Sequence, residues 1–222
     1  MRPKTNNDQQ RPAKTSKDET VDVTDAWLVA FDLAWESMLA GTTPVGSVVI
    51  DGSGRIVATG RSRRYVRDSV AGQLSYSHLA HAELNALAQL PPTDRYEDHT
   101  VLTTLEPCVL CVGAAVMATV GKVEYAGPDP YGGAAHLQLE NAHTNRLMPL
   151  MIGPDVGALG TFGALLHYAF YLERNPNGEV ADAYRKDLPD FVREVDDTGT
   201  TARVLRLKAE RRALSEALAL VV

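Results

Sequence analysis

Residues 100–126, TVLTTLEPCVLCVGAAVMATVGKVEYA, contain the pattern that decides the fold class. A β-rich run over 100–103 is followed by a longer apolar run over 108–120 and by a second β-rich run over 123–126. The two short runs predict strands, and the middle run, with Gly121 beyond its end, predicts a helix. Strands that alternate with helices are typical of a layered α/β domain.

The sequence before this stretch extends the same alternation. A helix is expected over 25–40, since Thr24 or Asp25 can cap its start and Gly41 can end it. Two β-rich runs over 45–50 and 56–60 flank the turn Asp-Gly-Ser-Gly, which predicts a hairpin. A further helix is expected over 79–90, ended by two prolines.

The sequence after residue 127 is less regular. About twenty residues separate the strand over 123–126 from the next β-rich run, which favours a parallel crossover, and Pro149 confines that run to a sheet edge. The elements expected here are a short helix over 134–141, a strand over 147–152, a helix over 156–173, a loop-like segment over 176–199 and a helix over 201–222.

Composition and charge exclude several classes of protein. The formal net charge of −6 gives no global attraction for nucleic acid or for an anionic membrane. Residues 1–22 lack the apolar core of a signal peptide and predict a disordered tail, and the apolar stretch over 109–120 is too short to span a bilayer. Two cysteines are too few for a disulfide scaffold. A cytoplasmic protein without membrane contact is expected.

Three side chains have the composition and spacing of a metal site. Cys108 and Cys111 lie at positions i and i+3 in the first turn of an expected helix, where exposed N–H groups and the helix dipole favour thiolates. His81 lies near the start of another expected helix. Two thiolates and one imidazole suit zinc, and three ligands leave the fourth tetrahedral position for water.

Glu83 makes this site look catalytic. A carboxylate beside the open position can take a proton from water and pass it to a leaving amine, provided that it is not itself a ligand.

The pattern His81-Ala82-Glu83, then Pro107-Cys108-Val109-Leu110-Cys111, resembles the zinc-dependent nucleobase and nucleoside deaminases of the cytidine deaminase superfamily. Residues 42–50, TTPVGSVVI, and 104–111, TLEPCVLC, look like the tRNA adenosine deaminase and guanine deaminase branch. The similar segments cover roughly residues 25–175.

The resemblance implies a three-layer α/β/α fold with a mixed sheet of about five strands. It implies a zinc-dependent hydrolase acting on cyclic amidines, with Zn²⁺ held by His81, Cys108 and Cys111, zinc-bound hydroxide as nucleophile and Glu83 as proton shuttle. A homodimer is also expected. We divide the chain into a tail (1–22), a catalytic domain (23–175) and a C-terminal extension with a helix (176–222).

Five residues are candidates for substrate contact. The family uses backbone groups at the positions of Ala82 and Pro107, and Ser62 stands where the family usually carries an asparagine that binds the base. Asp129 and Tyr131 follow the strand over 123–126, where α/β sites often collect ligand contacts, although turn formation explains both nearly as well.

The substrate remains open between a free base or nucleoside, which is favoured, and tRNA. A tRNA-specific adenosine deaminase would use the local basic cluster to touch RNA, whereas a solvated charged loop is the simpler interpretation of that cluster. The cluster comprises Arg61, Arg63, Arg64 and Arg67.

Three non-catalytic interpretations also remain. The chain can be a zinc scaffold subunit of a deaminase, in which Glu83 has no task. A closed structural zinc site would need a second histidine. The Cys108–Cys111 pair can also be redox-active. The histidines available for a closed site are His78, His99, His136, His143 and His167.

Glu106 lies directly before Pro107. It can orient a metal ligand, or its side chain can bind nearby backbone.

Overall fold

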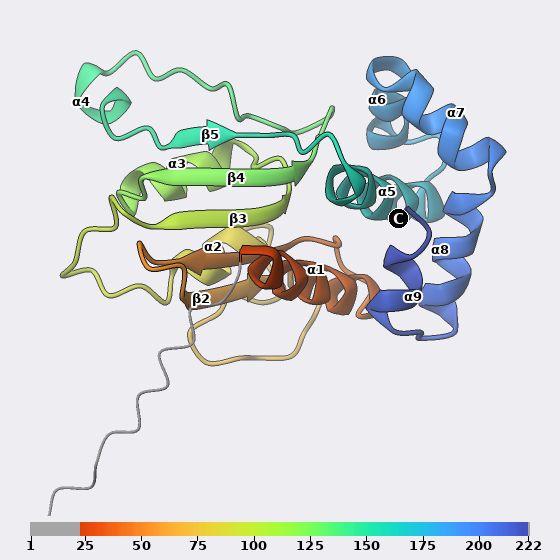
Figure 1. Cartoon of the computed structure of the whole chain (residues 1–222), viewed down its shortest axis with the longest axis horizontal. Helices are drawn as coiled ribbons and strands as arrows, with labels where there is room; N and C mark the ends of the chain where they lie inside the picture. Colours follow the sequence, from red (N-terminus) through yellow and green to blue (C-terminus); the bar gives the residue numbers. More distant parts are fainter. Residues whose placement is uncertain (1–22, 222) are drawn as a thin grey trace, which may run out of the picture.

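The computed structural model describes residues 23–221, so the tail expected over 1–22 lies outside the described residues. Within that range one sheet has the strand order β2-β1-β3-β4-β5 (Figure 1). β1 pairs antiparallel with β2 and β3, whereas β4 pairs parallel with β3 and β5, so the sheet is mixed. The strands are β1 (Gly46–Ile50), β2 (Ile56–Arg61), β3 (Thr100–Leu105), β4 (Lys122–Gly127) and β5 (Leu150–Ile152).

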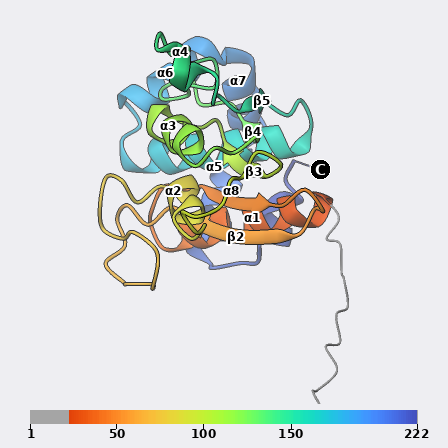
Figure 2. The ribbon, with the colours of Figure 1, turned by 90° about the vertical axis from the view of Figure 1, so that its left-hand side faces the viewer.

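Helices cover both faces of the sheet. Figure 2 shows α2 and α3 on one side of the strands and α1 on the other. The last four helices gather beside α5, away from α2 and α3 (Figure 1). The helices are α1 (Val23–Leu39), α2 (Ala82–Leu87), α3 (Val109–Met117), α4 (Ala142–Asn145), α5 (Ala158–Arg174), α6 (Glu179–Asp187), α7 (Pro189–Asp197), α8 (Thr200–Ala209) and α9 (Leu214–Leu218).

Alternation along the central strands explains the layers, because successive strand residues point to opposite faces. Val48 and Leu102 pack with the alanines of α1. Their neighbours Val49 and Val101 pack with Ala86 and Ala115 on the opposite side. The expected three-layer α/β/α fold is confirmed.

Most elements expected from the sequence are present, and β5 does lie at the sheet edge, parallel to β4. Across residues 23–221, no helix combines the length and the apolar character that crossing a bilayer requires. The confirmed elements are the helices near 25–40, 108–120 and 156–173, the hairpin of 45–50 with 56–60, and the strands near 100–103, 123–126 and 147–152.

Two expected helices are misplaced in the sequence-based prediction. The helix expected over 79–90 begins only at Ala82, because His81 has an extended backbone (φ −80°, ψ 156°). The short helix expected over 134–141 forms later as α4, because the Asn141 side chain accepts hydrogen bonds from the first N–H groups of that helix.

The prediction is also wrong in the C-terminal region. The segment expected to be a loop over 176–199 contains α6 and α7, since Pro189 fits the first position of a helix and Tyr184 anchors a narrow buried stripe. The single helix expected over 201–222 is divided into α8 and α9, because Arg211 has a positive φ of 53°.

Gly60 of β2 allows α2 to approach the sheet closely. A Cβ atom at this position would lie 2.3 Å from the Ala82 carbonyl oxygen and 2.4 Å from the Ala86 nitrogen, both of them backbone atoms. Because backbone cannot move aside as a side chain can, glycine at this point allows α2 to lie this close to β2.

We therefore expect Gly60→Ala to lower the free energy of unfolding by about 1–3 kcal/mol, as overpacking does, and to reduce the zinc content by displacing His81. Chemical denaturation and metal analysis of the purified protein measure both effects. The control is Gly113→Ala in α3, where an added Cβ meets no atom within 4 Å. Equal stability of the two variants would contradict this account of the packing.

Candidate metal centre

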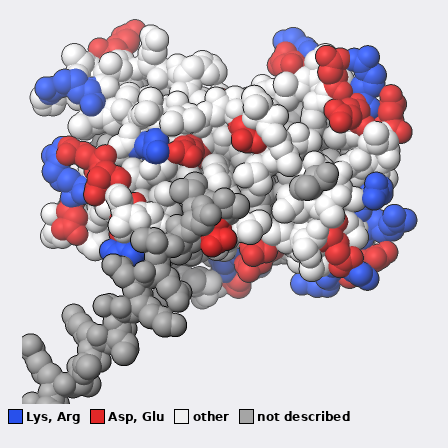
Figure 3. All heavy atoms as spheres, in the orientation of Figure 1, with Lys and Arg blue, Asp and Glu red and all other residues white. Residues whose placement is uncertain are grey.

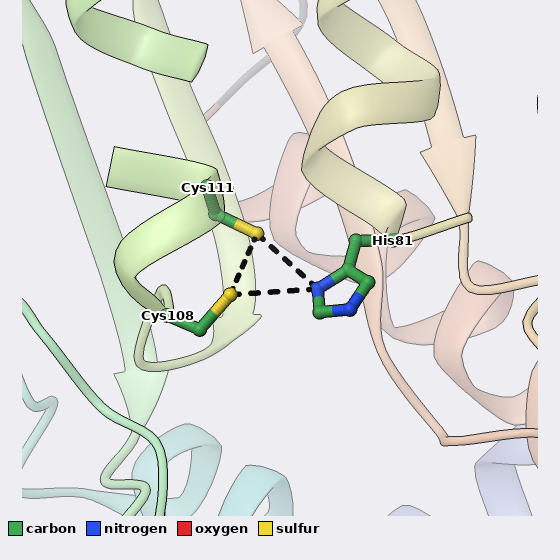
Figure 4. Close-up of side chains that lie close together, drawn as sticks. All are labelled: His81, Cys108 and Cys111. Atoms are coloured by element: carbon green, nitrogen blue, oxygen red, sulfur yellow. Dashed lines mark hydrogen bonds between the residues drawn. The ribbon is translucent and has the colours of Figure 1, made fainter. Parts of the chain in front are cut away.

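His81, Cys108 and Cys111 converge at the starts of two helices (Figure 4). The imidazole Nδ1 lies 3.6 Å from Cys108 Sγ and 3.4 Å from Cys111 Sγ, and the two sulfurs lie 3.5 Å apart. Tetrahedral zinc, with Zn–S of about 2.3 Å and Zn–N of about 2.0 Å, requires ligand separations of roughly 3.5–3.8 Å. The three donor atoms therefore fit a zinc ion, and Nδ1 is the histidine atom that faces it.

The backbone places two of these ligands in the same way. His81 is the N-cap of α2 and Cys108 is the N-cap of α3, and both residues have an extended backbone. At each of these positions the helix presents unpaired N–H groups and the positive end of its dipole. Cys111 follows within the first turn of α3, so its thiol meets Cys108 on the same side.

The electrostatics of the two thiols differ. The contact with Cys111 Sγ lowers the pKa of the Cys108 thiol to about 4, and the same contact raises the pKa of Cys111 well above its usual value. Without a cation, one proton is therefore retained by the pair. A bound divalent metal favours loss of that proton, because thiolates are the ligating form.

Glu83 lies beside this group and is only 5% exposed. Its Oε1 accepts a hydrogen bond of 2.9 Å from the Thr103 hydroxyl, and its Oε2 accepts one of 3.2 Å from Cys111 Sγ. Burial raises the pKa of the Glu83 carboxyl. A carboxyl group with a raised pKa, next to a metal site with three ligands, is suited to accepting and releasing a proton.

A cavity of about 180 Å³ opens next to the metal ligands and Glu83. Four of the five expected substrate contacts line it, namely Ser62, Ala82, Asp129 and Tyr131. Pro107 is not among the lining residues, and its carbonyl accepts a hydrogen bond from the Ala134 amide. The Ser62 hydroxyl is buried and has no hydrogen-bond partner among the described residues, which suits a group that awaits a ligand.

The cavity also has walls that the sequence did not predict. His167 and Tyr171 of α5 and Val180 of α6 line it, although all three lie far along the chain from the zinc motif. Thr103 was missed as well. These residues belong to helical and strand patterns that look like ordinary core, so the sequence marked none of them as a cavity residue. His167 was considered only as a ligand of a closed zinc site.

Three members of the basic cluster contact other side chains of this chain. Arg61 and Arg63 pair with Asp68, and Arg67 lies over the Tyr76 ring at 3.8 Å. Arg64 is the one member of the cluster that lines the cavity, and its Nε has no hydrogen-bond partner among residues 23–221.

Glu106 holds the loop after β4. Its carboxylate accepts hydrogen bonds from the amides of Asp129 and Ala135, which supports the backbone-binding interpretation of this residue. Asp129 Oδ1 in turn accepts from the amides of Tyr131 and Gly132, so turn formation accounts for one oxygen of Asp129.

The geometry favours the three-ligand centre over the closed site and the redox pair. In the described part of the chain, no further histidine, cysteine or acidic side chain joins the group of His81, Cys108 and Cys111. Both cysteines are free thiols that face the same imidazole nitrogen.

Comparison with known proteins supports this assignment. Residues 22–127 match the family model described as the cytidine and deoxycytidylate deaminase zinc-binding region. The tRNA(Ile)-lysidine synthase of Deinococcus deserti is 38% identical over 109 residues, which cover 47% of this chain and 19% of that protein. The cytosine deaminase of Candida albicans is 30% identical over 115 residues, which cover 51% of this chain and 71% of that protein. The chain thus spans only 19% of the first relative's length.

A solved structure from a study of A-to-I editing by tRNA:A34 deaminases shares the fold. The TM-score is 0.50 at 23% identity, and the match covers 59% of this chain and 92% of that one. Fold and ligand set together define a zinc-binding deaminase domain. The chain belongs to the cytidine and deoxycytidylate deaminase family.

The contact between Thr103 and Glu83 leads to a prediction about positioning. A hydrogen bond to a charged group contributes about 1.5–3 kcal/mol, so we expect Thr103→Val to lower kcat for deamination of an amino-substituted base by roughly 10- to 100-fold. The KM and the zinc content are expected to stay unchanged, and Thr103→Ser is expected to restore kcat. Loss of zinc, or an unaltered kcat, in Thr103→Val would contradict the role assigned to this hydroxyl.

Proposed function

We propose that this protein is a zinc-dependent hydrolytic deaminase, a hydrolase acting on cyclic amidines, whose substrate is an amino-substituted purine or pyrimidine. The oxygen of water adds to the ring carbon that bears the amine while a ring nitrogen is protonated, and the C–N bond then breaks, so that a carbonyl replaces the amine and ammonia leaves. The observation that carries the proposal is the buried Glu83 carboxyl, 3.2 Å from the sulfur of one ligand in a three-ligand group.

Each residue of the site has a separate chemical role in this reaction. His81, Cys108 and Cys111 would hold zinc, which when bound acts as a Lewis acid and lowers the pKa of a water in the fourth coordination position. Glu83 would accept one proton from the attacking water and pass it to a ring nitrogen, and would then take the second proton from the added oxygen and pass it to the departing amine. Thr103 keeps the carboxyl of Glu83 in place. The apolar walls exclude bulk water and thereby strengthen these interactions.

The size of the cavity supports a free base as the substrate. Cavities that hold drug-sized ligands measure roughly 300–1,000 Å³, whereas this cavity measures about 180 Å³. A single heterocycle suits that space better than a heterocycle with its ribose. The similarity to a cytosine deaminase points the same way.

A tRNA substrate is less well supported by the surface. Arg61 lies near Glu36 and shares Asp68 with Arg63, which lowers the charge that this cluster offers to a phosphate backbone. On the face shown in Figure 3, lysines and arginines are interspersed with acidic side chains. A scaffold without activity would have no use for a buried carboxyl, because burial of such a group costs stability.

The test is a substrate panel with the zinc-loaded protein, which offers cytosine, adenine, guanine, their ribonucleosides and an anticodon stem-loop, with ammonia release measured. We expect turnover of a free base. Glu83→Gln, which keeps the size of the side chain, is expected to retain zinc and to lose at least about 100-fold in kcat, as removal of a general acid–base does. Turnover of the stem-loop alone would contradict the proposal that a free base is the substrate. Full activity of Glu83→Gln would contradict the proposal that Glu83 transfers the proton.

We further propose a homodimer formed through the outer surface of α2 and α3. Met117 of α3 is 77% exposed and Leu74 is 42% exposed, and both line an apolar groove beside α2 and α3. Exposed apolar side chains grouped in this way are typical of an interface between protein chains.

We expect light scattering after size-exclusion chromatography to give the mass of a dimer, and Met117→Glu to shift the protein to the monomer. The matched control is Val156→Glu, since Val156 is fully exposed in the segment before α5. A dimer that survives Met117→Glu but not Val156→Glu would exclude this interface.

We also propose that the protein acts in the cytoplasm, which the two free thiols support. In our proposal, residues 176–222 extend the catalytic domain of 23–175. The Trp35 indole donates a 2.8 Å hydrogen bond to the Arg212 carbonyl, and one apolar core runs from α1 and α5 into α6, α8 and α9.

A further inference from the structure

His167 is a buried histidine that the proposed mechanism does not use. It lies in α5, is 4% exposed, and lines the cavity beside the metal centre. It also lies outside residues 22–127, the part of the chain that matches the family model. A neutral histidine has one ring nitrogen that donates a hydrogen bond and one that accepts, so the position of its proton decides what the ring can bind in the cavity.

The hydrogen bonds around Tyr184 settle that question. The Tyr184 hydroxyl donates to the Pro128 carbonyl oxygen at 3.2 Å, and a carbonyl oxygen can only accept. A hydroxyl has one proton, so the Tyr184 oxygen must act as acceptor toward His167 Nδ1, which lies 3.1 Å away. The hydrogen-bond network therefore assigns the proton of a neutral His167 to Nδ1 and leaves a lone pair on Nε2.

The charge of the ring agrees with this assignment. Burial lowers the pKa of His167, with Arg64 acting in the same direction and Asp129 in the opposite one. The ring is therefore neutral near pH 7. Nε2 makes no hydrogen bond to any residue within 23–221, so an unpaired acceptor remains at the wall of the cavity.

We propose that His167 Nε2 accepts a hydrogen bond from a ring N–H of the bound base, and that Tyr184 holds it in that role. The proposal rests on the deaminase function proposed above and specifies its substrate class. Free bases carry a ring N–H that is separate from the departing amine. In cytidine and adenosine that position bears the ribose, so for cytosine and adenine an acceptor at this wall selects the free base over the nucleoside. For guanine the same holds when the N–H that it binds is the one at N9.

The first test reads the tautomer directly. The ¹⁵N spectrum of the zinc-loaded protein with labelled histidine is expected to show His167 as the neutral Nδ1–H form at pH 7. Addition of cytosine, adenine or guanine is expected to shift the Nε2 resonance for at least one base, and Tyr184→Phe is expected to redistribute the proton between the two nitrogens. An Nε2–H form in the wild-type protein, or no shift with any of the three bases, overturns the proposal.

The second test is kinetic and uses bases methylated at one ring nitrogen. The derivatives are 1-methylcytosine, 9-methyladenine, 1-methylguanine and 9-methylguanine. For the base that the enzyme turns over, we expect one derivative to have a KM at least about tenfold higher, as loss of one hydrogen bond to the ligand gives. We expect His167→Phe to raise the KM of the parent base by a similar factor and to remove the difference between base and derivative.

Tyr168→Phe is the matched control for Tyr184→Phe. Tyr168 packs against Tyr184 at 5.4 Å between ring centroids and donates to Asp196, but it does not line the cavity. We expect Tyr184→Phe to raise KM and Tyr168→Phe to leave it unchanged. If His167→Phe leaves the KM for the parent base unchanged, the proposal is overturned. Absence of turnover of every compound would instead refute the deaminase function, and the spectra would still decide the role of His167.

Discussion

The site depends on two helices, α2 and α3, that begin near the carboxyl ends of the strands β2 and β3. β3 ends just before Cys108, and β2 passes close enough to α2 to set the position of His81. Both residues are N-caps, so the two first turns direct unpaired N–H groups and positive dipole ends toward one point. Negative charge is stabilised there, which is the property that thiolate ligands need. The metal centre is thus mainly a consequence of where backbone elements start.

This arrangement also explains why a carboxyl group can be buried beside sulfur. Glu83 would be costly in an apolar interior without partners. Thr103 and Cys111 donate to its two oxygens. A divalent cation held by His81, Cys108 and Cys111 would take the place of the Cys111 thiol proton and offset much of the charge of the carboxylate. The carboxyl, the thiols and the cation therefore form one electrostatic unit, in which removal of a member changes the proton affinity of the others.

The sequence allowed a correct prediction of most features whose determining residues lie close together along the chain. The hairpin, the central strands and the convergence of His81, Cys108 and Cys111 were predictable because turn residues, alternation and the two short motifs are local. The helices α6 and α7 were missed because their polar surface outweighs a narrow buried stripe around Tyr184. His167 was named only as one of several histidines, because its role depends on a tyrosine and a carbonyl that approach through tertiary packing.

The parts of the chain that supply chemistry and those that shape the cavity are separate. The ligands and Glu83 lie within residues 22–127, whereas α5 and α6 close the outer wall. These helices also hold the loop after β4, since Tyr184 donates to Pro128 and Tyr131 donates to Glu179 at 2.8 Å. A change in α6 therefore acts on the loop that carries Asp129 as well as on the wall itself. In the deaminase that we propose, substrate choice can therefore vary through the C-terminal helices while the proton transfer proposed for Glu83 stays the same.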